Sequence, residues 1–409
     1  MSLHFICLTA TGGVPIFTRK KGDCDTLPFS TVGSLNGVHM FCKSRGAQLN
    51  STYLEDDTVV VWKDFENCFT MIGIGRGYTE KVIRDFLDIV FNATIFSIGL
   101  NEVKHNKNPE QLKRELKQKC YPIVDKIIEN IDSDLLKLTD CIIPSGGTEI
   151  LARLNEFSDQ VGSPFCCVVM SRQKVVAGTE GWWDLNVIDR KLLITILSVS
   201  NSVQVDVPVY LPKKSPTIAY RFVCIPIFQM ISVCVVCGAE PQFSDAASLV
   251  QHIWRNDLEL LRNAKLCYPR NFSTNLPQFD PSILGILLVN RTHSKYVMSR
   301  NLQPAVGNKR VINTGGHHRL DILRSFFHQA VDIIDTFLCD ESSSALAPQT
   351  SPCKALESYW TLEYHKCHSF VSGDNLICIL FPSSIPVHTM RLITHRTLNI
   401  ILSEKDIAW

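Results

Sequence analysis

The sequence lacks an excess of charge of either sign, since its 409 residues contain 41 lysines and arginines against 40 aspartates and glutamates. Without a basic surplus there is no overall field that attracts a phosphate backbone, so nucleic acid is not expected as a partner. The amino terminus lacks the basic segment and long apolar stretch of a secretory signal peptide. One apolar stretch, residues 222–237, is rich in β-branched residues and is interrupted by Pro226, which favours buried strands over a membrane helix. We therefore expect a cytoplasmic protein with at most peripheral membrane contact.

The sequence also lacks a convincing catalytic, cofactor or metal motif. Glycines at 73, 75 and 77 resemble a dinucleotide loop, but the third comes one place early and the strand before them belongs to no βαβ unit. There is no Walker-A sequence and no G-x-S-x-G elbow. Cys234 and Cys237 form a C-x-x-C without a second pair, and the histidines near 317 and 365 lack the spacing of metal ligands. We expect no catalytic residue, no cofactor and no metal, and hence a protein that acts by binding other proteins.

Cysteine is abundant, but its distribution does not indicate disulfides. The sixteen cysteines are spread over a long chain, and most lie within apolar runs. Free cysteine behaves there as a small buried hydrophobe. The cysteines are therefore predicted to be reduced core residues.

What the sequence does contain is one order of elements that recurs three times. A hairpin at 3–17 precedes a helix at 29–43, in which Val32, Leu35, Val38 or His39, and Cys42 follow the helical period. Strands at 48–54, 58–63 and 68–74 come next, and then a long amphipathic helix that Thr79 can cap. Asn108 before Pro109 predicts the start of a further helix. This ββαβββα order returns after residue 162 and, less regularly, after residue 283.

The predicted domains are 1–143, 160–270 and 281–409, because the composition changes near 143–147 and 269–281. Each is α+β, with helices on both sides of an antiparallel sheet. In the third domain a helix at 317–338 leads to a Ser- and Pro-rich stretch at 340–352, which predicts a flexible loop. Strands at 356–365 and 376–381 and a helix at 386–403 complete it.

Two features leave surface and core readings open. Trp182 and Trp183 lie between a hairpin and a helix and are either exposed interface anchors or a plug between core elements. A basic group is either a solvated helix face, with glutamates interspersed, or a contact for acidic lipid or an acidic partner. The group consists of Lys104, Lys107, Lys113, Arg114, Lys117 and Lys119.

Five sequence blocks together resemble the Fuzzy family of planar cell polarity effectors. They are LPFSTVGSLNGVHMF (27–41), TVVVWK (58–63), DCIIP (140–144), EGWWDLN (180–186) and VPVYLPKKSPT (207–217). The blocks cover the first and second domains, and the third is assigned by chain order. The resemblance implies a protein of three longin domains, each a five-stranded antiparallel sheet between one helix and two.

The resemblance also implies a function. Fuzzy-like proteins pair with Inturned and associate with Fritz in the CPLANE complex, which supports planar polarity and ciliogenesis from the cytoplasm, the cytoskeleton and the ciliary base. The implied activity is guanine-nucleotide exchange by the pair on a ciliary Rab, with a small GTPase of the Rem/Rab-like class as a further partner. The alternative is a scaffold without exchange activity that stabilises Inturned and recruits Fritz and ciliary transport machinery.

An exchange factor needs no acid, base or nucleophile, because it only has to bind the GTPase more tightly when the switch loops are displaced. In related pairs the first longin domains meet and form the platform for the GTPase. We therefore place the candidate surface on the first helix and an adjoining strand. Its residues are Asn36, His39, Met40, Lys43 and Trp62.

Overall fold

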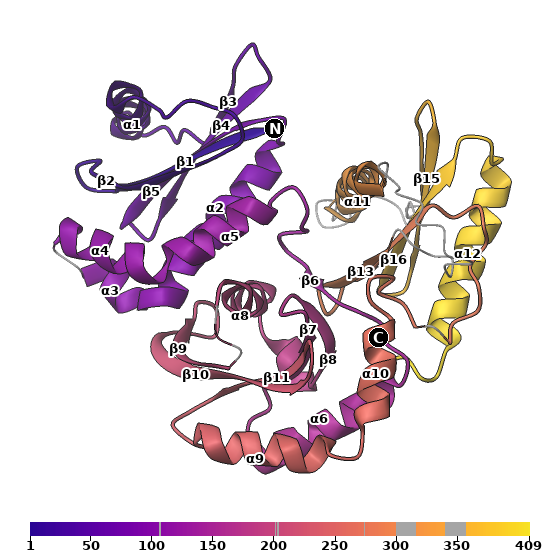
Figure 1. Cartoon of the computed structure of the whole chain (residues 1–409). Coiled ribbons are helices and arrows are strands. Elements are labelled where there is room, and N and C mark those ends of the chain that lie inside the picture. The colour runs from indigo at the N-terminus through magenta and orange to yellow at the C-terminus, as the bar shows by residue number, and fades with distance from the viewer. Residues whose placement is uncertain (106–107, 201, 203, 274, 300–315, 340–356) are drawn as a thin grey trace, which may run out of the picture. The chain divides into compact units, whose positions relative to one another are not determined.

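The computed structural model describes residues 1–409 apart from 106–107, 201, 203, 274, 300–315 and 340–356. It contains three sheets with helices beside them, so the predicted α+β class with three longin-like sheets is confirmed (Figure 1). The chain divides into two compact units. The first unit comprises Met1–Lys137, Leu185–Cys224 and Val236–Gln242, and the second comprises Leu138–Asp184, Ile225–Val235 and Phe243–Trp409.

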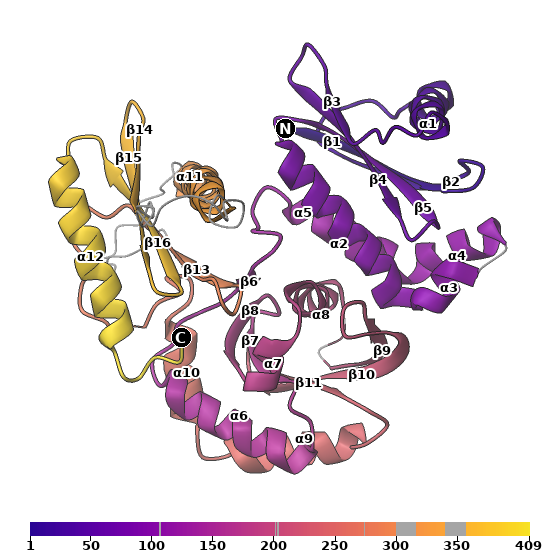
Figure 2. The ribbon, with the colours of Figure 1, turned by 180° about the vertical axis from the view of Figure 1, so that it is seen from behind.

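The first sheet has the strand order β2-β1-β5-β4-β3, and all its pairs are antiparallel. Helix α1 covers one face, where Val32 packs on Ile6, Trp62 and Ile72. Helices α2 and α5 cover the other face, where the Phe86 ring meets Phe5 at 5.6 Å (Figures 1 and 2). The elements are β1 Ser2–Thr9, β2 Pro15–Lys21, α1 Phe29–Ser44, β3 Ser51–Tyr53, β4 Thr58–Phe65, β5 Phe69–Arg76, α2 Glu80–Ile98, α3 Leu100–His105, α4 Pro109–Lys119 and α5 Tyr121–Asn130.

Local signals in the sequence predicted two helix starts correctly. The Thr79 side chain accepts a hydrogen bond from the Val82 N–H at the start of α2. Asn108 accepts from the N–H groups of Glu110 and Gln111 at the start of α4. Both side chains satisfy donors that have no partner in the first helical turn.

The glycines at 73 and 75 have a packing role. Both lie within strand β5, and a β-carbon added at Gly73 would sit 2.4 Å from Ile83 Cγ2 on α2. A β-carbon added at Gly75 would lie 2.7 Å from Ile83 Cδ1. The missing side chains let α2 lie close against the sheet, which accounts for a glycine pattern that resembles a nucleotide loop.

The second sheet has the order β8-β7-β11-β10-β9. Helix α6, which precedes it and was not among the predicted elements, buries Ile150, Leu154 and Phe157 and packs on β7, β8 and α9. The predicted hairpin, helix and three strands are present. The elements are α6 Gly147–Val161, β7 Cys166–Met170, β8 Lys174–Gly178, α7 Glu180–Asp184, α8 Val187–Val199, β9 Val205–Leu211, β10 Ser215–Phe228, β11 Ile231–Cys237, α9 Phe243–Trp254 and α10 Leu258–Leu266.

The third sheet has six strands, in the order β14-β15-β16-β12-β13-β6, with α11 and α12 on opposite faces (Figure 2). The sequence predicted only two strands after α11 and assigned none to 366–372. That prediction was wrong, because β15 is a central strand that buries the polar side chains of His368 and Ser369, which obscures the apolar pattern. The elements are β6 Thr139–Asp140, β12 Gly285–Asn290, β13 Lys295–Ser299, α11 Gly316–Cys339, β14 Glu357–Thr361, β15 His365–Ser372, β16 Asn375–Pro382 and α12 Val387–Ser403.

The segment before α6 joins elements within the second unit. The Thr139 N–H donates to the Ser294 carbonyl, just before β13, at 2.9 Å. The Cys141 N–H donates to the Tyr296 carbonyl, within β13, at 2.8 Å. The Ile142 N–H donates in the other direction, to the Val175 carbonyl in β8 at 2.9 Å. Asp140 also forms an ion pair with Lys174 at 2.5 Å. Residues 139–142 therefore hydrogen-bond to strands of both the second and the third sheet.

Two further predictions concern membranes and loops. Among the described residues, no helix is long and apolar enough to cross a bilayer. The stretch 222–237 forms β10 and β11, as predicted. The predicted flexible loop at 340–352 lies outside the described residues.

Candidate partner-binding surface

Helix α1 exposes large apolar side chains, although it lies directly on the first sheet. Phe29 is 78% exposed, Phe41 61%, Val38 53% and Met40 41%. We call these four residues the α1 face. Large apolar groups exposed together on one element are typical of protein–protein contact sites.

The opposite side of α1 holds the helix on the sheet. Val32 and His39 are buried, and Leu35 and Cys42 are half-buried, so the core stripe passes through His39. Val38 was the other candidate for that position, and it faces away from the core. Because His39 occupies the core position, the neighbouring Val38 lies on the exposed side of the helix.

Two glycines lie between the residues of the α1 face. An added β-carbon at Gly33 or Gly37 would have no neighbour within 4 Å, so nothing in the described chain packs on this part of the helix. Glycine inside a helix costs about 0.5–1 kcal/mol relative to alanine. The pair weakens the helix in the free chain without improving any contact within it.

Asp64 on β4 anchors the carboxyl-terminal half of α1. Its carboxylate accepts hydrogen bonds from Lys43 Nζ at 2.8 Å and Thr70 Oγ1 at 2.7 Å, and His39 Nε2 lies 3.6 Å away. Burial alone would raise the pKa of Asp64, but the hydrogen bonds from Lys43 and Thr70 outweigh it and hold the pKa below its ordinary value. Asp64 is therefore a carboxylate that ties the helix to the strand beneath.

The predicted site residues divide between support and surface. Trp62 is only 3% exposed, and its indole N–H donates to the Leu35 carbonyl at 3.3 Å. His39 is buried beside Asp64. Both side chains are buried between α1 and the sheet, so their placement on the exposed surface has to be corrected.

The other three predicted residues are more accessible. Asn36 is half-buried and lies against the β1–β2 turn, where a β-carbon at Gly13 would be 2.1 Å from its Nδ2. Lys43 is half-exposed but engaged by Asp64. Only Met40 is both exposed and apolar. The sequence interpretation missed Phe29, Val38 and Phe41, and the signal available for them was apolar residues outside the core stripe.

Strand β3 offers a second feature of this domain, because it is the edge of its sheet and pairs with β4 alone. Tyr53 and the following Leu54 are exposed. The hydroxyl groups of Ser51 and Tyr53 donate to Glu80 at 2.8 and 3.3 Å. An edge strand flanked by exposed apolar residues can add a strand from another chain.

The two tryptophans proposed as interface anchors contact this chain. Trp182 is fully buried. The Trp183 ring lies 4.6 Å from Lys295 Nζ, and Trp409 contacts the same ammonium at 4.8 Å. These contacts lie within the second unit and favour the reading in which Trp182 and Trp183 join core elements.

The basic group is partly a solvated face. Lys104 pairs with Glu66 at 2.9 Å, whereas the basic side chains of α4 are exposed. Leu112 and Leu116 hold α4 against the domain. Lys107 lies outside the described residues.

Two strongly perturbed ionisable groups, Asp189 and His368, are buried and structural. Burial raises the pKa of Asp189 to about 6, although its carboxylate accepts N–H bonds from Lys213 and Lys214. Burial also lowers the pKa of His368 to about 4, and Nδ1 of this ring lies 2.8 Å from Thr394 Oγ1. Across the described part of the chain, no group of three or more His, Cys, Asp or Glu is placed to hold a metal.

Comparison with known proteins gives matches along most of the chain. Residues 3–127, 161–255 and 282–405 match, in order, the first, second and third longin domains of FUZ, MON1 and HPS1. The chain is 30% identical over 414 residues to the protein fuzzy homolog of Xenopus tropicalis, covering 97% of both chains. It is 35% identical over 299 residues to those of Rattus norvegicus and Homo sapiens, covering 71% of each chain. The predicted domain limits themselves stay a prediction.

Proposed function

This chain belongs to the family of three-longin proteins of FUZ, MON1 and HPS1, and from that premise we propose that it pairs with Inturned through the α1 face. The pair acts as a guanine-nucleotide exchange factor for a ciliary Rab and associates with Fritz in the CPLANE complex. A small GTPase of the Rem/Rab-like class is a further partner. The protein works in the cytoplasm, with cytoskeletal or ciliary-base association, in planar cell polarity and ciliogenesis.

The exposed α1 face is the observation that carries this proposal. Phe29 and Phe41 are among the most exposed large apolar residues of the described chain. Fully burying one such side chain contributes about 1.5–3 kcal/mol. Because these rings are already partly covered, burying both contributes roughly 2–4 kcal/mol, which is enough to form the centre of an interface.

The glycines of α1 support a partner that approaches closely. Gly33 and Gly37 lie one helical turn apart, and no side chain fills the space above them. Small residues at this spacing allow another backbone to come near a helix. Strand β3, at the edge of the first sheet, offers main-chain hydrogen bonds to a strand of the same partner.

Exchange by the pair requires differential binding rather than side-chain chemistry. A surface that fits the GTPase better with its switch loops displaced shifts the population toward that state and weakens the phosphate and magnesium contacts. In this proposal no residue of this chain acts as an acid or base. Exchange activity belongs to the complex with Inturned and not to this chain alone.

A scaffold without exchange activity is the second candidate. It is favoured by exposed apolar side chains far from α1 in the sequence, among them Leu392 on α12, which is 70% exposed, and Leu266 at the end of α10. Such a scaffold stabilises Inturned and recruits Fritz and ciliary transport machinery. Both candidates require the same pairing, so pairing is tested first.

The test is co-purification of Inturned with a Phe29→Ser, Phe41→Ser double variant. Removing two exposed rings leaves the fold intact, since surface changes of this kind usually alter stability by less than about 0.5 kcal/mol. We expect binding to fall at least about tenfold, because roughly 2–4 kcal/mol of apolar contact is removed. Leu392→Ser is the matched control on another domain and should leave Inturned binding unchanged. Undiminished binding by the double variant would refute the assignment of the α1 face.

A further inference from the structure

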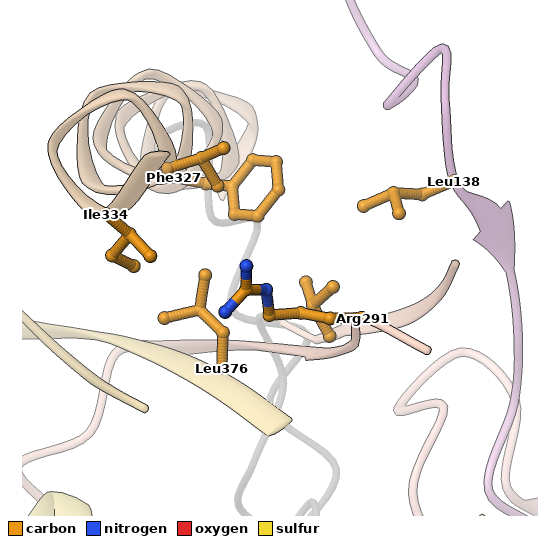
Figure 3. A pocket seen from close by; sticks show the side chains of 7 residues that line it. Leu138, Arg291, Phe327, Ile334 and Leu376 are labelled. Carbon is orange, nitrogen blue, oxygen red and sulfur yellow. The ribbon is translucent and has the colours of Figure 1, made fainter. Parts of the chain in front are cut away.

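The third domain contains an apolar cavity that the proposed pairing does not use. It lies in the second unit, between α11 and the strands that α11 covers, and has a volume of about 180 Å³ (Figure 3). Phe327, Val331 and Ile334 line it from α11, and Val289 and Leu376 line it from β12 and β16. Leu138, which directly precedes β6, closes one side.

One charged side chain, that of Arg291, reaches into this apolar surrounding. Figure 3 shows its guanidinium turned toward Phe327 and above Leu376. Its backbone is fixed at the end of β12, where the Arg291 N–H donates to the Asp374 carbonyl at 2.8 Å. Within the described part of the chain the guanidinium forms no ion pair or side-chain hydrogen bond. It is therefore a cation held at an apolar cavity and available to a carboxylate.

The size of the cavity limits what it can take. Pockets for cofactors and drug-sized ligands usually measure about 300–1,000 Å³, whereas an engineered cavity of about 150 Å³ holds one benzene molecule. The space found here is suited to one aromatic or branched side chain. Such a side chain buried in a well-packed pocket is the usual anchor of a protein interface.

We infer that this cavity receives an apolar anchor residue of a partner protein, whose neighbouring carboxylate pairs with the Arg291 guanidinium. The carboxylate comes from an aspartate or glutamate beside the anchor, since a fork of N–H donors matches a carboxylate in a bidentate geometry. The site lies in the third domain, and α1 lies in the first. It can therefore exist whether or not α1 pairs with Inturned.

The test uses the full chain with methyl-labelled isoleucine, leucine and valine and two blocked dipeptides. Acetyl-Phe-Asp-amide carries the anchor and the charge, and acetyl-Phe-Asn-amide is its neutral isostere. We expect the acidic peptide to shift the methyl signals of Leu138, Val331, Ile334 and Leu376. It should bind about fivefold more tightly than the neutral peptide, as for a partly exposed charge pair. Equal binding, or shifts elsewhere only, would overturn the inference.

Two variants separate the charge from the cavity. Arg291→Gln should abolish the preference for the acidic peptide. Because the Arg291 side chain is exposed, this substitution should leave the fold intact. Arg396→Gln, an exposed arginine on α12, is the matched control and should preserve the preference. Val331→Trp fills the space and should abolish binding of both peptides. If dodecanoate displaces the acidic peptide and binds more than tenfold more tightly, the cavity is an acyl-chain site and the inference of a protein anchor is wrong.

Discussion

Alanine at the two glycines of α1 should stabilise the free chain while weakening its pairing. Gly33 and Gly37 have open space around them and no left-handed backbone angle. Each replacement removes backbone freedom from the unfolded chain, and each should contribute about 0.5–1 kcal/mol. The Gly33→Ala, Gly37→Ala variant should therefore gain about 1–2 kcal/mol of stability in the first domain.

The same substitution at Gly73 is the matched control, with the opposite sign. There the new β-carbon would lie 2.4 Å from Ile83 Cγ2, so α2 would have to move away from the sheet. Overpacking of this kind costs about 1–3 kcal/mol. Denaturant unfolding, followed by amide exchange of peptides from α1 and β5, measures both changes in the full chain without a partner.

Binding of Inturned then tests whether a partner uses the open space. If a helix of the partner lies close to α1, two added methyl groups separate the backbones, and affinity should fall at least about tenfold even though the free chain is more stable. A variant that loses stability would show that the glycines pack within the free chain. A stabilised variant with unchanged affinity would show that no partner backbone approaches α1 there.

Three further outcomes are expected. Acid should destabilise the third domain, because His368 has a folded pKa of about 4 against 6.5 when unfolded. The contribution of His368 to the free energy of unfolding is complete above pH 6.5 and falls by about 3 kcal/mol as the pH drops toward 4. Urea unfolding across this range checks the loss: His368→Gln should flatten the pH dependence of stability, and an equal slope in the variant would contradict the assignment. Trp62→Ala should destabilise the first domain by about 3–5 kcal/mol through the cavity left under α1, with Trp62→Phe much milder, as calorimetry can determine. Ile142→Pro should cost about 1–3 kcal/mol by removing the N–H that donates to Val175, and Ile142→Val is its control; equal melting of the two variants would show that this bond is dispensable.

Short-range signals explain why so much of the fold could be predicted from the sequence. Thr79 and Asn108 cap helices through their own neighbours, and the turn at 11–13 closes a hairpin between adjacent strands. These interactions are local, so their residues indicate the structure directly. The threefold recurrence of elements then followed from order alone.

Two of the missed elements, strands β15 and β6, depend on contacts that are distant in the sequence. Strand β15 buries His368, whose ring is accommodated by Thr394 on α12, a residue 26 positions away. Strand β6 is two residues long and exists only because β13 lies beside it. No pattern within either segment indicates such a partner.

The candidate site shows the same limit. The residues predicted near α1 include Trp62 and His39, whose side chains are buried, whereas the exposed Phe29 and Phe41 were not predicted. The period of the helix was compatible with either Val38 or His39 in the core stripe. The choice between them depends on Asp64, which lies 25 residues beyond His39 in the sequence. Its carboxylate lies beside the His39 imidazole and pairs with Lys43.

The most direct test of the central claim is release of a fluorescent guanine nucleotide from candidate ciliary Rab proteins. The chain alone, Inturned alone and the co-purified pair are compared. We predict acceleration by the intact pair only. An intact pair that accelerates release from none of the Rab proteins would contradict the exchange function and leave the scaffold as the better account.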